Sequence, residues 1–242
     1  MKKQNYIIGI VGLGYVGLSL AYLSQKKFTT YGFDIDKTKI NKLKKNISYI
    51  SDLDFNKINF NIKKKFFPKS NFNSLELCDY IVICVPTPLK KDQKTPDVSF
   101  INDTIKRISK INYKNKTIIL ESTSWPGTTK ELIINKLNNN QLKCGVDYFV
   151  CFSPERINPG DSYNTYKNTP KIVGADDISS LKKGKFFYKK LFNKIIIASS
   201  NAVAEASKLY ENTFRSINIS FANELKYSFR KLGIDLWEVI DI

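Results

Sequence analysis

Three glycines follow a short apolar run near the N-terminus, in the spacing G-x-G-x-x-G. The run is Tyr6 to Val11, and the glycines are Gly12, Gly14 and Gly17. The first glycine permits a tight turn from strand to helix, the second lets a pyrophosphate approach the backbone, and the third lets the helix pack closely on the strand. Unpaired N–H groups at the start of that helix favour an anion. These residues therefore predict a dinucleotide site.

Asp34 follows a second apolar run, Thr29 to Phe33. Asp34 stands 20 residues after Gly14 in the sequence. At this separation a carboxylate can accept hydrogen bonds from a ribose. It favours NAD over NADP, because a 2′-phosphate would meet its negative charge. The glycine spacing alone is a weak signal, but strand, helix and distal acid occur together here. The alternative is a glycine-rich turn in an unrelated α/β domain.

Polar residues follow three later apolar runs, each at the point where a strand is expected to end. They are Thr87 after Tyr80–Val85, Glu121 and Thr123 after Thr117–Leu120, and Glu155 after Asp147–Phe152. In an open α/β sheet, ligands bind outside the carboxyl ends of the strands. We therefore expect these side chains to line a site. The VPTP string that contains Thr87 is also compatible with a rigid loop that binds nothing.

A long helix is predicted from Asn201 to Lys231, with Gly233 just after its end. Glu205, Lys208 and Asn212 stand at positions i, i+3 and i+7 and share one face of it. Lysine and asparagine on such a face could bind a developing alkoxide. The alternative is an ordinary solvated face. A helix of this length usually spans domains or a dimer interface.

Strands and helices alternate before this long helix. Further strands are expected at Phe66–Phe67, Lys171–Gly174 and Lys194–Ala198, and helices at Val16–Ser24, Asp36–Lys45, Val98–Ile111, from Thr128, and at Ile178–Leu191. This alternation predicts an α/β fold, a Rossmann-like doubly wound parallel sheet. We expect residues 1–198 to form a dinucleotide-binding domain and residues 199–242 to begin a second, helical domain that is incomplete here.

Composition excludes several classes of function. The 242 residues carry a formal net charge of +17 and no His, so His catalysis and the usual zinc sites are absent and no metal is expected. The lysines are spread along the chain without a nucleic-acid module, so no nucleic-acid partner is expected. The four cysteines form no C-x-x-C pair and predict buried thiols in a reducing compartment. No apolar stretch approaches the length that crosses a bilayer, so we expect a cytoplasmic protein without a membrane span.

Six strings occur in order: IGIVGLGYVG, GFDID, CVPTPL, ESTSWPGTT, SPERINPGD and EASKLYENTFRSINISFANEL. With them the chain resembles the UDP-glucose/GDP-mannose dehydrogenase family of nucleotide-sugar 6-dehydrogenases over essentially its whole length. SPERINPGD and VPTPL resemble most the branch that acts on UDP-N-acetylhexosamines. The resemblance implies NAD-dependent oxidation of a sugar CH₂OH to a carboxylate in two hydride transfers, for surface polysaccharide biosynthesis.

The resemblance also implies roles for single residues. The residues that would contact NAD are Gly12, Gly14, Tyr15, Val16, Gly17, Asp34, Lys39, Thr87 and Glu121. Thr123 would help hold an ordered water and the substrate oxygens, and Glu155 would act as a general base or polarise water during thioester hydrolysis. Lys208 would stabilise the oxyanion electrostatically. Asn212 would hydrogen-bond the same oxygen or its water.

The sequence departs from the family in one respect that concerns the chemistry. The family's second oxidation uses a cysteine in a G-G-x-C segment, which follows the long helix, as does the domain that binds uridine diphosphate. This sequence stops at Ile242, before either. We therefore expect that it cannot complete the two-step oxidation by itself. A second departure is Pro159, where the UDP-glucose enzymes carry another Glu.

Other interpretations remain open at this point. UDP-glucose is the alternative substrate. The chain could be a non-catalytic NAD-binding fragment, since the cysteine segment is absent. It could also be another Rossmann dehydrogenase with a helical tail, such as a hydroxyacid enzyme, although SPERINPGD argues against this. A homodimer through the long helix is a further expectation.

Overall fold

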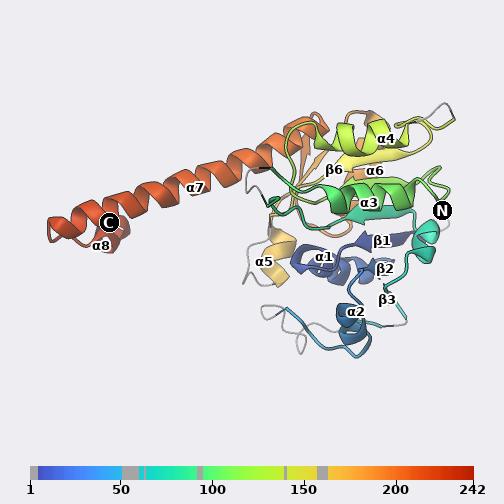
Figure 1. Ribbon diagram of the computed structural model, residues 1–242, viewed down its shortest axis with the longest axis horizontal. Coiled ribbons are helices and arrows are strands. Elements are labelled where there is room, and N and C mark those ends of the chain that lie inside the picture. The colour runs from blue at the N-terminus through green and yellow to red at the C-terminus, as the bar shows by residue number, and fades with distance from the viewer. Residues whose placement is uncertain (1–4, 51–59, 63, 92–94, 139–140, 157–162) are drawn as a thin grey trace. The chain divides into compact units, whose positions relative to one another are not determined.

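The computed structural model describes residues 5–50, 60–62, 64–91, 95–138, 141–156 and 163–242 (Figure 1). The chain divides into two compact units, Met1–Glu205 and Ala206–Ile242, and each is described by itself. Pro159 and the end of the SPERINPGD string lie outside the described residues. The expected domain boundary after residue 198 stays a prediction.

In the described part of the first unit, eight strands form one sheet in the order β3-β2-β1-β4-β5-β6-β7-β8. The strands are β1 Ile7–Val11, β2 Thr29–Phe33, β3 Phe66–Lys69, β4 Tyr80–Ile83, β5 Thr117–Leu120, β6 Phe149–Phe152, β7 Lys171–Gly174 and β8 Ile195–Ala198. The order reverses direction between β1 and β4, which is where a doubly wound sheet binds its ligand. The predicted α/β sheet is confirmed, and every predicted strand is present.

One pairing differs from the predicted all-parallel sheet. β6 and β7 pair antiparallel, with Phe152 opposite Gly174, whereas all other neighbours pair parallel. A parallel neighbour requires a crossover that returns the chain to the opposite edge of the sheet. Here Lys171, the first residue of β7, lies within hydrogen-bonding distance of Pro154, which follows the carboxyl end of β6. The chain therefore re-enters the sheet from that same edge.

Helices cover both faces of the sheet and enclose two apolar cores. One core includes residues of α1 (Tyr15–Gln25), α2 (Lys37–Lys44) and α6 (Ile178–Lys189). The other includes residues of α3 (Ser99–Ile108), a π-helical stretch (Lys130–Ile134) and α4 (Asn135–Leu137). Figure 1 shows α3 and α4 side by side, where Lys136 of α4 donates a hydrogen bond to Asn102 of α3.

Side-chain caps explain where two of the predicted helices begin. The carboxylate of Asp36 accepts hydrogen bonds from the backbone N–H groups of Thr38 and Lys39 at the start of α2. Asp177 caps α6 in the same way through the N–H of Ser180. A cap of this kind contributes about 1 kcal/mol to helix stability. The sequence did not predict the 3₁₀-helix Asn73–Leu77 or the short helix α5, Tyr163–Asn168.

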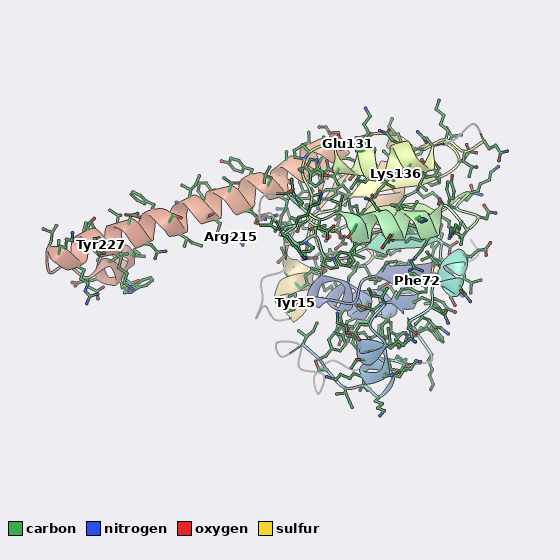
Figure 2. All side chains as sticks on the ribbon, viewed as in Figure 1. Tyr15, Phe72, Glu131, Lys136, Arg215 and Tyr227 are labelled. Carbon is green, nitrogen blue, oxygen red and sulfur yellow. The ribbon has the colours of Figure 1, made fainter. Side chains whose placement is uncertain are left out.

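The long helix α7 spans Asn201–Lys231, as predicted, and all of it from Ala206 onward lies in the second unit. Gly233 follows with a positive φ of 73° and ends it, and α8, Leu236–Asp241, comes next. Arg215 and Tyr227 project from α7 in Figure 2. None of the helices in the described residues is long and apolar enough to cross a membrane.

Candidate functional site

The turn between β1 and α1 requires glycine at two positions. Gly12 has a φ of +89°, and a Cβ there would lie 2.7 Å from the carbonyl oxygen of Cys84. A Cβ on Gly17 would lie 1.9 Å from the carbonyl oxygen of Gly12. A Cβ on Gly14, in contrast, would meet no described atom within 4 Å. The backbone at Gly14 is therefore open to a ligand.

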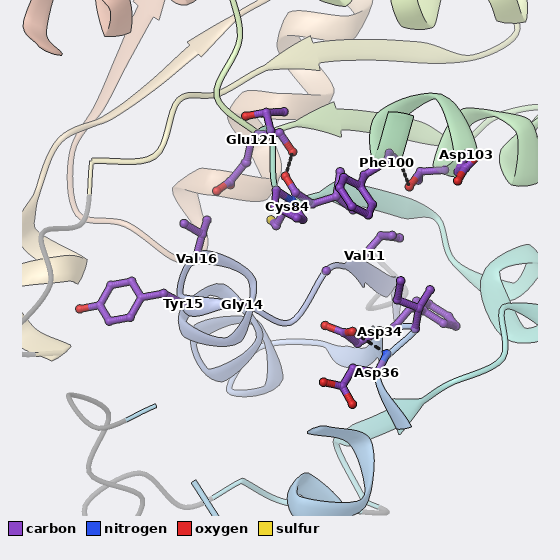
Figure 3. Close-up of a pocket in the computed structure, with 18 of the residues that line it drawn as sticks. Val11, Gly14, Tyr15, Val16, Asp34, Asp36, Cys84, Phe100, Asp103 and Glu121 are labelled. Carbon is purple, nitrogen blue, oxygen red and sulfur yellow. Dashed lines mark hydrogen bonds between the residues drawn. The ribbon is translucent and has the colours of Figure 1, made fainter. Parts of the chain in front are cut away.

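A pocket of about 640 Å³ opens beside this turn (Figure 3). Ten of the thirteen residues singled out from the sequence line it: Gly12, Gly14, Tyr15, Val16, Asp34, Lys39, Thr87, Glu121, Thr123 and Glu155. Gly17 packs behind the turn instead. Lys208 and Asn212 belong to the second unit, so their predicted roles stay predictions.

Asp34 lies at one side of the pocket, at the end of β2. Its carboxylate accepts hydrogen bonds from the backbone N–H groups of Leu13 and Asp36, both at 2.9 Å. The ammonium of Lys39 lies 3.8 Å from the same carboxylate. An ionised carboxylate has about four acceptor positions, so two backbone bonds leave capacity for a ribose.

The N-terminus of α1 also lies at the pocket and suits a diphosphate. No side chain in the described residues caps this helix, and its N-cap position is Gly14. Uncapped N–H groups and the helix dipole attract an anion. The open backbone at Gly14 and the helix end would therefore face the diphosphate of a dinucleotide, and Asp34 would face a ribose, so the residues present fit NAD.

Helix α3 supplies a wall that the sequence interpretation missed. Phe100, Asp103, Thr104 and Arg107 line the pocket, and their spacing places them on one face of the helix. The guanidinium carbon of Arg107 lies 4.4 Å from the centre of the Phe72 ring. The helical spacing of these positions along Val98–Ile111 was the available signal.

Two loops at the carboxyl ends of β4 and β5 are tied to each other. The hydroxyl of Thr87 donates a hydrogen bond to the carbonyl oxygen of Thr123 at 3.0 Å. The hydroxyl of Ser122 donates to the carbonyl oxygen of Val85 at 2.7 Å. The VPTP string is therefore part of the pocket wall as well as a rigid loop.

Glu121 is buried at the other side of the pocket. Its carboxylate accepts a hydrogen bond from the hydroxyl of Tyr188 and lies 3.1 Å from the ammonium of Lys171. Burial raises the pKa of Glu121 to about 7, although Lys171 opposes the shift. Glu155 lies 3.5 Å from the same ammonium. The sequence interpretation missed Lys171 and Tyr188, since neither stands in a recognisable motif.

Glu205 holds the start of α7 against the loop that follows β5. Its buried carboxylate accepts hydrogen bonds from the N–H of Gly127 at 2.7 Å, and from the N–H and hydroxyl of Thr129 at 2.8 and 2.6 Å. The residue predicted to share a face with Lys208 thus has a structural partner of its own. No group of three metal-ligating side chains occurs in the described residues.

Comparisons with known proteins agree with this geometry. The model of the NAD binding domain of the UDP-glucose/GDP-mannose dehydrogenase family matches residues 6–192, and the model of its central domain matches residues 202–242. The chain is 38% identical over 240 residues to Protein CapL of Staphylococcus aureus, covering 98% of this chain and 55% of that protein. It is 35% identical over 241 residues to UDP-N-acetyl-D-glucosamine 6-dehydrogenase of Pseudomonas aeruginosa, covering 96% and 55%.

Solved structures give the same result. The UDP-D-ManNAc dehydrogenase of Pyrococcus horikoshii superposes with a TM-score of 0.88 at 27% identity, covering 97% of this chain and 56% of that one. A ternary complex of GDP-mannose dehydrogenase from Pseudomonas aeruginosa gives 0.89 at 26%, covering 97% and 55%. The chain spans about half the length of the curated relatives it matches. From its matched domains and its fold, the chain belongs to the UDP-glucose/GDP-mannose dehydrogenase family.

Proposed function

We propose that this chain binds NAD in the pocket and provides the cofactor site for oxidation of a UDP-N-acetylhexosamine at C6. The observation that carries the proposal is the open backbone of Gly14 at the start of α1, with Asp34 in the same pocket. Asp34 favours NAD over NADP because its carboxylate would repel a 2′-phosphate. The family match to an NAD binding domain supports this.

The substrate class comes from the relatives. Two that are at least 30% identical to this chain bear the name UDP-N-acetyl-D-glucosamine 6-dehydrogenase. Others bear the name UDP-N-acetyl-D-mannosamine dehydrogenase. We therefore prefer an N-acetylated UDP-hexosamine, and UDP-glucose is the alternative substrate.

The chain's own residues would act as follows. When bound, NAD would supply the hydride acceptor for oxidation at the sugar C6. Thr123, in the loop after β5, would hold a water and the substrate oxygens, and Glu155 would act as a base towards substrate or water. Lys208 and Asn212 of α7 would stabilise the oxyanion.

The thiol chemistry of the second oxidation needs a cysteine that these residues do not supply. Cys78, Cys84 and Cys151 are buried, and burial raises the pKa of each thiol above its ordinary value. Burial also raises the pKa of Cys144, to about 11. The reactive form is the thiolate, so none of the four is a suitable nucleophile. A non-catalytic NAD-binding protein is therefore the second candidate.

Two further expectations belong to the same proposal. A homodimer through α7 is supported by an exposed apolar stripe at Phe214, Ile217 and Phe221. Analytical ultracentrifugation of wild type and Ile217→Asp would test it, and a monomeric wild type would refute it. A cytoplasmic location agrees with four free cysteines.

Calorimetric titration of the 242-residue chain with NAD tests the cofactor site. We expect Asp34→Ala to weaken binding about tenfold or more, since hydrogen bonds to a charged group contribute about 1.5–3 kcal/mol. Asp97→Ala is the matched control, because Asp97 also accepts a backbone N–H two residues ahead and does not line the pocket among the described residues. A folded chain that binds no NAD, or equal affinities in Asp34→Ala and wild type, would refute the proposal.

A further inference from the structure

A lysine is buried beside the pocket, where it contacts two carboxylates. Lys171 is 2% exposed and is the first residue of β7. Its Nζ lies 3.1 Å from Glu121 Oε2 and 3.5 Å from Glu155 Oε2, and it donates a hydrogen bond to the carbonyl oxygen of Pro154 at 3.2 Å. Glu121 and Glu155 line the pocket, whereas Lys171 is not among the described residues that do.

Lysine is rarely buried unless its charge is paired. Burial by itself lowers the pKa of Lys171, but the carboxylates of Glu121 and Glu155 outweigh burial and leave that pKa above its ordinary value. Lys171 is therefore an ammonium group at neutral pH. Its single positive charge is shared by two carboxyl groups.

Two phenols also contact the carboxylates. Tyr188 of α6 donates a hydrogen bond to Glu121 Oε1, and Tyr166 of α5 donates one to Glu155 Oε2 at 3.3 Å. Burial raises the pKa of both phenols well above the ordinary value, so both stay neutral. The phenols orient the carboxylates and add no charge.

The net charge of this cluster depends on Glu121. When both carboxyl groups are ionised, they exceed the lysine by one negative charge. Burial raises the pKa of Glu121 to about 7, and Lys171 lowers it in part. The thiol of Cys84, which faces the cluster from the end of β4, stays neutral because burial raises its pKa well above the ordinary value. The carboxyl group of Glu121 therefore gains its negative charge near neutral pH.

The cluster lies on a definite side of the pocket. In a doubly wound sheet the ribose acid follows β2 and the diphosphate lies over the turn after β1. The nicotinamide end of the cofactor must then extend toward the ends of β5 and β6, which Glu121 and Glu155 follow. Figure 3 shows Asp34 and Glu121 on different sides of the pocket. The nicotinamide ring is cationic in NAD⁺ and neutral in NADH, so a negative charge at this end distinguishes the two.

We propose that Lys171 is a positioning residue: it fixes Glu121 and Glu155 at the nicotinamide end of the pocket and sets the charge that favours NAD⁺ over NADH. The inference rests on the proposed function, because it needs the cofactor in this pocket. Lys171 acts through the two carboxylates. A merely structural ion pair, joining β7 to the ends of β5 and β6, would leave the preference between NAD⁺ and NADH unchanged.

The test is the ratio of the affinities for NAD⁺ and NADH, measured by calorimetry on the 242-residue chain from pH 6 to 9. In wild type we expect the ratio to rise about tenfold in favour of NAD⁺ as the pH passes about 7, because one buried charge is gained near the ring. Without Lys171 the ionised form of Glu121 loses its cation. Lys171→Met should therefore move the rise upward by about one pH unit or more, to the upper end of this range or beyond it.

Two further variants separate charge from packing. Lys171→Arg keeps a cation, so its affinity ratio should rise at nearly the same pH as that of wild type. Lys116→Met is the matched control: the Lys116 ammonium donates to the carbonyl oxygens of Glu76 and Cys78, before the start of β5 and away from the pocket. The affinity ratio of Lys116→Met should rise at the same pH as that of wild type. If Lys171→Met does not fold, Lys171→Gln carries the same expectation.

The outcomes separate the two proposals. If the affinity ratio of Lys171→Met rises at the same pH as that of wild type, the positioning role is overturned and cofactor binding is left intact. A wild-type ratio that does not change with pH would do the same. A folded wild-type chain that binds neither NAD⁺ nor NADH would overturn both. Tyr188→Phe removes a hydrogen bond that favours ionised Glu121, so it should give a smaller upward shift, and no shift there would also contradict the inference.

Discussion

The two sides of the pocket are built on different principles. On one side, the turn from Gly12 to Gly17 is shaped by backbone geometry, and its contacts lie close together in the sequence or on adjacent strands. On the other side, Lys171, Glu121 and Glu155 form a largely buried cluster of charges from three separate strand ends. The first side depends on the absence of side chains, and the second depends on the presence of three particular ones.

This difference determines how each side responds to substitution. An added methyl group can destroy the glycine turn through steric overlap, at any pH. The cluster tolerates changes of shape better than changes of charge, because an unpaired charge in a buried site is costly. Substitutions on the two sides should therefore differ in whether their effects depend on pH.

The largest expected effect is that of Lys171→Met at pH 8, above the pKa of Glu121. The substitution leaves the buried carboxyl group of Glu121 and the partly buried one of Glu155 without their cation, and loss of one partner of a buried pair costs about 3–5 kcal/mol. Urea denaturation would measure it. The double variant Lys171→Met, Glu121→Gln should recover part of the loss. A double variant less stable than Lys171→Met alone would show that charge is not the cause.

The second effect is a dependence of stability on pH. Glu121 has a pKa of about 7 in the folded chain, against an ordinary value of 4.5. Between these values the unfolded chain releases the proton and the folded chain keeps it, so the free energy of unfolding falls as the pH rises and levels off above about 7. At about 1.4 kcal/mol per pH unit the full loss is about 3 kcal/mol.

Glu121→Gln should remove this part of the pH dependence. The quantity to measure is the difference in unfolding free energy between wild type and Glu121→Gln from pH 4.5 to 8, since the other titrating groups cancel. Parallel curves for the two proteins would contradict the raised pKa of Glu121.

The third prediction concerns the glycine turn. Gly17→Ala places a Cβ 1.9 Å from a backbone oxygen and should cost about 3 kcal/mol. Gly14→Ala meets no described atom within 4 Å, so its stability should change by about 0.5 kcal/mol or less while NAD affinity falls. Thermal melts and calorimetry on both variants give the comparison. Equal stability of the two variants, or a Gly14→Ala chain that binds NAD normally, would refute it.

The smallest effect is expected for Lys39→Ala. Lys39 is a partly exposed partner of Asp34 at 3.8 Å. Exposed ion pairs contribute about 1 kcal/mol or less, and salt screens them. NAD affinity should fall less than about fivefold, and the difference from wild type should shrink in about 0.5 M NaCl, as fluorescence titration would show. A loss as large as that of Asp34→Ala would show that Lys39 contributes as much to NAD binding as Asp34 does, and would contradict this prediction.

The sequence predicted the glycine-turn side well because its signals are local. The spacing from Gly12 to Asp34 is set by one strand, one helix and the next strand, which pair directly. The limits of α7 were predicted because both of its ends are marked by local signals. A polar residue, Asn201, stands at its start, and Gly233 follows its end. The antiparallel direction of β7 was not, since no residue in Lys171–Gly174 records the edge from which a strand enters the sheet.

By itself the sequence determined the α/β order of elements, the glycine turn, Asp34 and the ends of the strands that face the pocket. Those features follow from backbone conformation and from spacing within single strand–helix–strand units. Only the tertiary structure brought Lys171 and Tyr188 to Glu121, from strands and helices far along the chain. The raised pKa of Glu121 was likewise decided only by the tertiary structure, because its burial and its neighbouring charge exist only after strands β5, β6 and β7 have come together.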